Sequence, residues 1–149
     1  FLHLKDVEAT SCCEWIFEHV RVRRNDLIDA QIATYFYLGL TTDGGNFMYD
    51  KDSVRTLGNA LDLVKRGADK KSIVFHLFRQ RSYAAIKFMQ LVLSRMQIQG
   101  KLVWSRYTQE EIEAYKINKE EADYAMIWMQ SMKETHVAVL LRTFGNIIK

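Results

Sequence analysis

The sequence has no proline, only two cysteines and no long apolar run. Without proline, no stiff linker between segments is indicated. Cys12 and Cys13 are adjacent, so a disulfide between them would be strained, and the spacing of a metal-binding pair is missing. We therefore expect both to be small, buried apolar residues in a protein of a reducing compartment.

No apolar stretch approaches the ~18 residues that a transmembrane helix needs. The first residues also lack the charged-then-apolar pattern of a leader peptide, so we expect a cytoplasmic protein without a membrane partner. The 21 Lys and Arg residues against 18 Asp and Glu residues leave a net charge of +3, too small to indicate nucleic-acid binding unless the charges cluster. An apolar content of 48% indicates a folded protein, either one ordinary domain or two small ones.

Helical patterns dominate the first hundred residues. Apolar periodicity predicts helices over 10–20, 27–40 and 53–66, each preceded by residue types that cap helix N-termini. The candidate caps are, in order, Thr10 or Ser11, Asn25 or Asp26, and Asp52 or Ser53. The second helix is apolar almost all round after Ile32, so we expect its second half to be buried. The third helix has an expected core face of Leu57, Ala60, Leu61 and Val64.

The pattern changes near Gly100. Before it, a short helix and then a long one are predicted, the long one ending before Gly100. After it, 101–108 is typical of a strand, a capping box of Thr108 and Glu111 begins a helix, and 118–132 predicts another. The segment 135–149 predicts two strands joined by a Gly-Asn turn. We expect a domain boundary within residues 82–99.

Residues 39–49, GLTTDGGNFMY, place an acid and two glycines at the end of an apolar helix. Gly44 and Gly45 allow the backbone to turn sharply and to approach another group closely. Asp43 has two interpretations, a polar residue in an ordinary helix C-cap turn or a metal ligand. Spacing alone favours the cap.

The order of several segments resembles the DHH phosphoesterases, in particular the bacterial nano-RNases and phosphoadenosine-phosphate phosphatases. An A-A-S-T-A-E segment of that branch is matched here by residues 9–14, ATSCCE. Its Y-x-G-[IL]-x-x-D-T-G-x-F signature is matched by Tyr37, Gly39, Leu40, Asp43, Gly45 and Phe47. Gly44 replaces the usual threonine, which removes a hydroxyl but leaves the acid in place.

The resemblance implies an α/β fold with a catalytic domain built on a parallel sheet and a smaller mixed α+β domain. Residues 1–82 would be the C-terminal, helix-rich part of the DHH catalytic domain. Residues 83–99 would be an interdomain linker helix, and 100–149 the N-terminal part of the DHH-associated domain. Two manganese ions would lie in the cleft between the domains, with Asp43 matching the acid of the family's fourth conserved motif, which ligates metal.

Such a centre explains why an acid is needed. Two divalent cations ~3.5–4 Å apart activate water and offset charge on the phosphoryl oxygens, and hard cations select carboxylate ligands. The implied activity of the parent protein is manganese-dependent hydrolysis of short oligoribonucleotides, linear dinucleotides or 3′-phosphoadenosine nucleotides. A homodimer is a candidate assembly.

The sequence does not contain the Asp-His-His triplet. We expect the triplet and the early paired-aspartate motif upstream of Phe1, and interpret the chain as a fragment that is inactive alone, because one carboxylate cannot hold two metal ions. Two alternatives stay open. One is a degenerate relative that binds a nucleotide or a protein partner without turnover, and the other is a structural helical module with no site.

Other polar residues have simpler interpretations. His3, His19, His76 and His136 lack metal-binding spacing and are expected to be structural or surface residues. Basic residues at 21–24 and 65–71 could guide a short nucleic acid toward a cleft. Solvated helix ends are the commoner meaning, since Lys65 and Arg66 lie in a predicted last turn, where cations favour the helix dipole.

Overall fold

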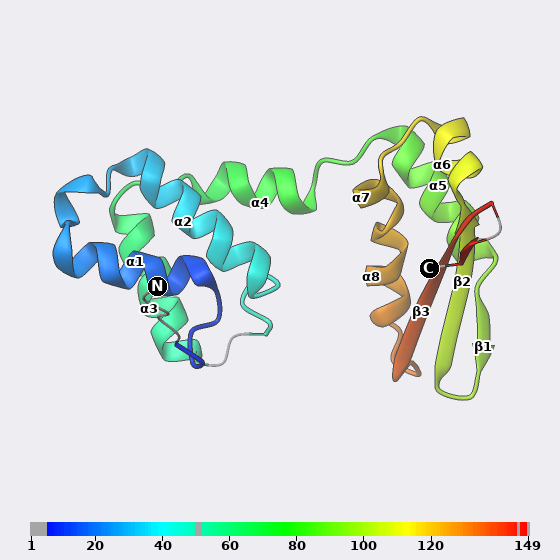
Figure 1. Cartoon of the computed structure of the whole chain (residues 1–149), viewed down its shortest axis with the longest axis horizontal. Coiled ribbons are helices and arrows are strands. Elements are labelled where there is room, and N and C mark those ends of the chain that lie inside the picture. Colours follow the sequence, from blue (N-terminus) through cyan, green and yellow to red (C-terminus); the bar gives the residue numbers. More distant parts are fainter. Residues whose placement is uncertain (1–5, 50–51, 146, 149) are drawn as a thin grey trace. The chain divides into compact units, whose positions relative to one another are not determined.

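The computed structural model describes residues 6–49, 52–145 and 147–148. The chain divides into two compact units, Phe1–Gln80 and Arg81–Lys149 (Figure 1). Each unit has its own core. Within the described residues, no helix combines the length and apolar character that a bilayer span requires. The assignment of these units to parts of a catalytic and a DHH-associated domain stays a prediction.

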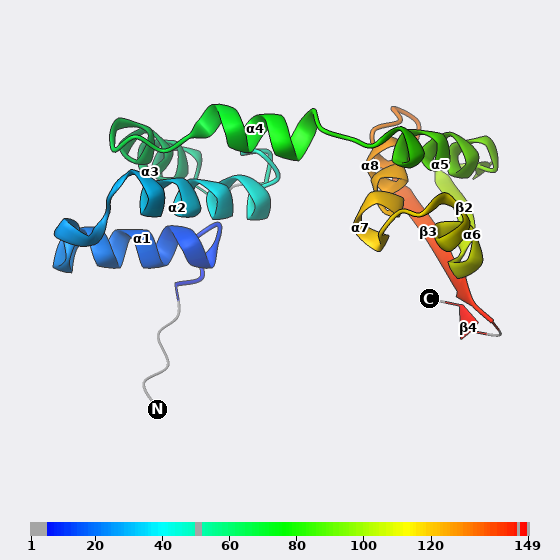
Figure 2. The ribbon, with the colours of Figure 1, turned by 90° about the horizontal axis from the view of Figure 1, so that it is seen from above.

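Unit 1 consists of helices in its described part. They are α1 (Cys12–Arg23), a 3-10 turn (Asn25–Leu27), α2 (Ala30–Asp43), α3 (Ser53–Lys65) and α4 (Lys70–Phe78). In Figure 2, α1 and α2 lie side by side, in agreement with their mutual contacts. The three helices predicted before residue 67 are therefore confirmed.

Capping side chains set the starts of these helices. Ser11 and Asp52 cap α1 and α3, as expected, by accepting hydrogen bonds from backbone N–H groups that a helix start leaves unpaired. The predicted cap of α2 is wrong. The 3-10 turn occupies Asn25 and Asp26, so α2 begins later, with Asp29 accepting the N–H of the third helical residue.

The core of unit 1 lies where α1, α2 and α3 meet. Phe17, Leu40 and Leu63 are fully buried there. The predicted core face of α3 is wrong at three of its four positions, because Leu57, Leu61 and Val64 are exposed. The face of α3 that is buried consists instead of Thr56, Asn59, Ala60 and Leu63. The second half of α2 is likewise only partly buried, since Tyr35 and Leu38 are exposed.

Unit 2 is a four-stranded sheet with helices packed against it (Figure 2). Its elements are α5 (Tyr83–Ser94), β1 (Gln97–Gln99), β2 (Leu102–Thr108), α6 (Gln109–Tyr115), α7 (Lys119–Ala122), α8 (Tyr124–Gln130), β3 (Val137–Phe144) and β4 (Ile147–Ile148). The spatial order is β1-β2-β3-β4. The central pair β2 and β3 is parallel, and both outer pairs are antiparallel.

The core of unit 2 lies between the helices and one face of β2. Val103, Ser105 and Tyr107 alternate with more exposed neighbours, as expected for a strand covered on one face. Phe88 and Val92 of α5 are fully buried in the same core. The helix predicted to link two domains thus contributes its apolar face to unit 2.

Most of the predicted elements of unit 2 are confirmed, including the Thr108–Glu111 capping box and the hairpin that turns at Gly145. Two details are wrong. The single helix predicted over 118–132 is broken at Asp123 into α7 and α8. The helix predicted to run almost to Gly100 ends at Ser94, and 97–99 forms β1. All three residues of β1 are exposed, so backbone pairing with β2 rather than apolar burial makes them a strand.

Candidate functional site

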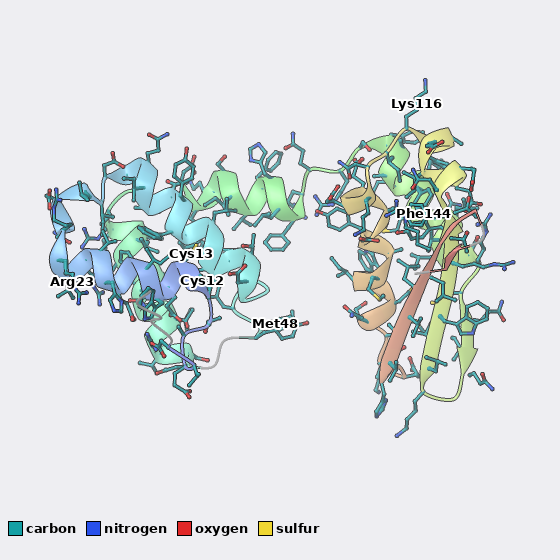
Figure 3. All side chains as sticks on the ribbon, in the orientation of Figure 1. Cys12, Cys13, Arg23, Met48, Lys116 and Phe144 are labelled. Atoms are coloured by element: carbon teal, nitrogen blue, oxygen red, sulfur yellow. The ribbon has the colours of Figure 1, made fainter. Side chains whose placement is uncertain are left out.

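Asp43 is the last residue of α2, and its side chain is exposed. Gly44 follows as the C-cap, its N–H donating to the Leu40 carbonyl at 3.2 Å. The chain then turns back, with the N–H groups of Met48 and Tyr49 donating to the Gly44 carbonyl at 2.9 and 3.0 Å. Met48, at the far side of this turn, points away from unit 1 (Figure 3).

The turn after Asp43 contains three successive residues in the left-handed region. The φ angles are +56° at Gly45, +59° at Asn46 and +66° at Phe47. Glycine adopts this conformation freely and asparagine tolerates it, but for phenylalanine it costs roughly 1–2 kcal/mol. The Phe47 ring packs edge-on against Tyr37, with a centroid separation of 6.2 Å, and this contact offsets part of that cost.

Residues of α1 and of the segment before it lie against α2 and the start of the turn. A Cβ on Gly39 would overlap the Cys13 side chain, so glycine allows α1 and α2 to approach closely at this point. Burial raises the pKa of the Cys13 thiol, and the Asp43 carboxylate raises it further. The expectation that both cysteines are buried is wrong. Cys12 is exposed, and Cys13 is half-buried.

A polar network joins α1, α3 and the segment before α1. The fully buried Glu14 accepts the backbone N–H of Thr10 at 2.8 Å and the Asn59 side-chain amide at 3.2 Å. The same amide donates to Glu18 at 2.7 Å. Sequence reasoning missed this network, because polar residues at helical spacing look like a solvated face until their partners are known.

Arg55 is the cation of this network. Its guanidinium contacts Glu18 at 2.6 and 2.9 Å and Asp6 at 2.7 Å. The hydrogen bond from Arg55 holds the pKa of Glu18 below its usual range, although burial acts in the opposite direction. The same guanidinium lowers the pKa of Asp6. Other arginines also pair with carboxylates, Arg21 and Arg66 with Asp62.

Asp43 does not have further metal ligands around it in the part of the chain that the structure describes. No group of three or more His, Cys, Asp or Glu side chains there could hold a metal ion. Nδ1 of His19 and of His76 lies 2.9 and 2.7 Å from a carbonyl oxygen of its own helix, a structural role as expected. His3 lies outside the described residues. Within the described ranges, Asp43 offers one carboxylate and not a complete metal centre.

Sequence reasoning also passed over an Asp-x-Asp spacing, at Asp50 and Asp52. Asp50 lies outside the described residues. Asp52 is the N-cap of α3, and its Oδ1 accepts the Arg55 N–H at 3.0 Å. The structure therefore gives Asp52 a capping role.

The fold is shared with a solved structure, an exopolyphosphatase-related protein from Bacteroides fragilis. The TM-score is 0.85 at 23% sequence identity, over 99% of this chain and 47% of that one. The fold is thus established. The structural match says nothing by itself about what this chain does.

A curated relative adds a sequence match. The chain is 29% identical over 146 residues to the bifunctional oligoribonuclease and PAP phosphatase NrnA of Mycoplasma genitalium, covering 91% of this chain and 45% of NrnA. No protein-family model matches the sequence. The chain therefore spans less than half the length of each of these two proteins, and the match to NrnA supports the resemblance to DHH phosphoesterases.

Proposed function

We propose that this chain is part of a DHH-type phosphoesterase in which Asp43 is one metal ligand. The observation that carries the proposal is the exposed Asp43 carboxylate at the start of a turn with left-handed residues, in a chain similar in sequence to NrnA. Left-handed non-glycine residues concentrate at functional sites, where the surrounding structure holds them in place. The C-terminal end of a helix also carries partial negative charge, which favours a cation beside Asp43.

The proposed substrates are short oligoribonucleotides, linear dinucleotides or 3′-phosphoadenosine nucleotides, the classes that the activities of NrnA suggest. Two bound manganese ions would supply an activated water and offset phosphoryl charge. The contribution of this chain is to hold one carboxylate in a fixed direction. Because the described residues give one ligand position only, we propose that the remaining ligands come from outside the chain and that the chain alone is inactive.

The Asp43→Ala variant tests the proposal in the protein expressed from its complete gene. We expect kcat/KM for Mn²⁺-dependent hydrolysis of a linear diadenylate to fall by about 100-fold or more, because loss of a ligand weakens the metal site. Asp26→Ala is the matched control. Asp26 is an exposed carboxylate of the same unit, paired with Arg24 and distant in sequence from the turn. Full activity of Asp43→Ala would contradict the assignment of Asp43.

Activity and binding measurements on the wild-type protein also distinguish the enzyme from the alternative, a binding module without turnover. That alternative predicts Mn²⁺ or nucleotide binding by the wild-type protein with no hydrolysis at any metal concentration. A complete coding sequence without an Asp-His-His triplet or equivalent acids would favour it over the enzyme.

A further inference from the structure

Glu14 is a fully buried carboxylate that the proposed chemistry does not use. A buried carboxylate is costly unless donors satisfy it, and both of its oxygens have one here. Oε2 accepts the Thr10 backbone N–H at 2.8 Å, and Oε1 accepts the Asn59 amide at 3.2 Å. One donor belongs to α3 and the other to the segment that precedes α1.

Thr10 extends this contact to the turn that carries Asp43. Its Cγ2 lies 3.3 Å from the position that a Cβ on Gly44 would occupy, and Gly44 is buried. On its other side, Thr10 Oγ1 lies 3.1 Å from Thr56 Oγ1 in α3. Thr10 is thus held by Glu14 and by α3, and its methyl group lies beside Gly44, the C-cap of α2.

The turn depends on such support. Its left-handed residues persist only where the surrounding structure fixes them. The Thr10 methyl group lies beside Gly44, and the Phe47 ring packs against the Tyr37 ring. A shift of Thr10 would therefore remove the contact of its methyl group with Gly44, at the C-terminal end of α2.

We propose that Glu14 is a positioning residue, which fixes Thr10 and through Thr10 fixes the turn that presents the Asp43 carboxylate. The effect on metal binding rests on the proposed function. The effect of Glu14 on the conformation of the turn does not rest on the proposed function. It can be measured in the 149-residue chain itself.

Three variants separate this role from general stability. Glu14→Met keeps the length of the side chain and removes both acceptors. Glu14→Gln keeps one acceptor oxygen, which can accept the Thr10 N–H. The Asn59 amide does not need that oxygen, because it also donates to Glu18 at 2.7 Å. Glu18→Gln is the matched control, a change of the same kind one turn along α1, in a residue that bonds Asn59 and Arg55.

The first measurement is amide hydrogen exchange resolved by NMR. The reporters are three N–H groups of the turn: Asn46 donates to the Thr41 carbonyl of α2, and Met48 and Tyr49 donate to the Gly44 carbonyl. We expect Glu14→Met to accelerate their exchange by about tenfold or more, as for the loss of one buried hydrogen bond, while the middle of α2 keeps its protection. Glu14→Gln and Glu18→Gln should stay within about threefold of the wild type at these amides, because the turn opens locally and its exchange does not follow the global stability.

The second measurement uses the protein expressed from its complete gene. We expect Glu14→Met to raise the Mn²⁺ concentration for half-maximal activity by about tenfold, with an unchanged KM for the diadenylate. Glu14→Gln should restore most of the metal affinity. A purely structural role would lower stability without producing this separation of metal affinity from KM.

If Glu14→Met does not fold, Thr10→Ala tests the same link, since it keeps the N–H that Glu14 accepts and removes the methyl group against Gly44. Faster exchange at 46–49 would support the proposal. Wild-type exchange there in folded Glu14→Met or Thr10→Ala would overturn it, as would an equal effect of Glu18→Gln. A wild-type protein without Mn²⁺-dependent turnover would contradict the proposed function, and the exchange data would still decide the role of Glu14.

Discussion

Gly39 and Gly58 are both helical glycines, yet their surroundings predict opposite effects of an added methyl group. A Cβ on Gly39 would overlap Cys13, whereas a Cβ on Gly58 meets nothing within 4 Å. We expect Gly39→Ala to lower the free energy of unfolding by about 1–3 kcal/mol through overpacking between α1 and α2. Gly58→Ala should raise it by about 0.5–1 kcal/mol, the usual gain in a helix interior.

Chemical denaturation of both variants, followed by the fluorescence of Trp15 with Trp104 and Trp128 replaced by Phe, measures this difference within unit 1. Two changes of the same sign would contradict the packing assigned to Gly39. The same contact gives a physical reason for one residue of the sequence signature. Gly39 belongs there because α1 lies against it, a requirement independent of catalysis.

At the scale of elements, Arg55 and Glu18 join α3 to α1. The Arg55 hydrogen bond lowers the pKa of Glu18 in the folded state. Glu18 therefore stabilises the fold fully above its unfolded pKa of about 4.3, and this stabilisation is lost as the pH falls through the lower, folded pKa. We expect Glu18→Gln to lower the free energy of unfolding by about 1–2 kcal/mol at pH 7. The stabilisation is not lost completely, because the amide oxygen of glutamine still accepts a hydrogen bond.

The pH dependence of that cost is the sharper measurement. The difference in unfolding free energy between the wild type and Glu18→Gln, measured with the Trp15 reporter, should be constant from pH 7 to 5 and shrink below about pH 4. A difference that stays constant down to pH 3 would show that the charge of Glu18 does not contribute.

The helices were predictable where local chemistry decides their ends. Ser11, Asp52 and Thr108 are capping residues by type, and each caps the helix that follows it. The facing of α3 was not predictable in this way. It has apolar residues on two sides, and the side that is buried includes Thr56 and Asn59, whose partners lie in distant segments. Apolar periodicity cannot choose between two such faces.

The candidate site was likewise predictable in its position along the chain but not in its contacts with distant segments. The sequence located Asp43 at a helix end, and the structure places it there. Its surroundings depend on contacts between segments, such as Thr10 beneath Gly44 and Glu14 bonded to Thr10. A single sequence carries no direct sign of these pairs. Whether Asp43 binds a metal stays a prediction.

At the scale of the whole chain, the two units have separate cores. Unit 1 buries apolar side chains among helices, while unit 2 buries them between helices and a sheet. Since α5 packs within unit 2, the division falls in the short connection before it. Unfolding of the chain is therefore not expected to follow a single two-state transition.

A matched pair of leucines in α3 tests this independence. Leu63 is fully buried and Leu61 is 55% exposed. We expect Leu63→Ala to cost about 2–5 kcal/mol and Leu61→Ala less than about 1 kcal/mol, as reported by Trp15 in unit 1. With Trp15 replaced by Phe, Trp104 and Trp128 report on unit 2. Their denaturation midpoint should be unchanged in Leu63→Ala, because Leu63 belongs to the core of unit 1 and the core of unit 2 is built from other residues. An equal shift of both midpoints would show instead that the two units unfold together.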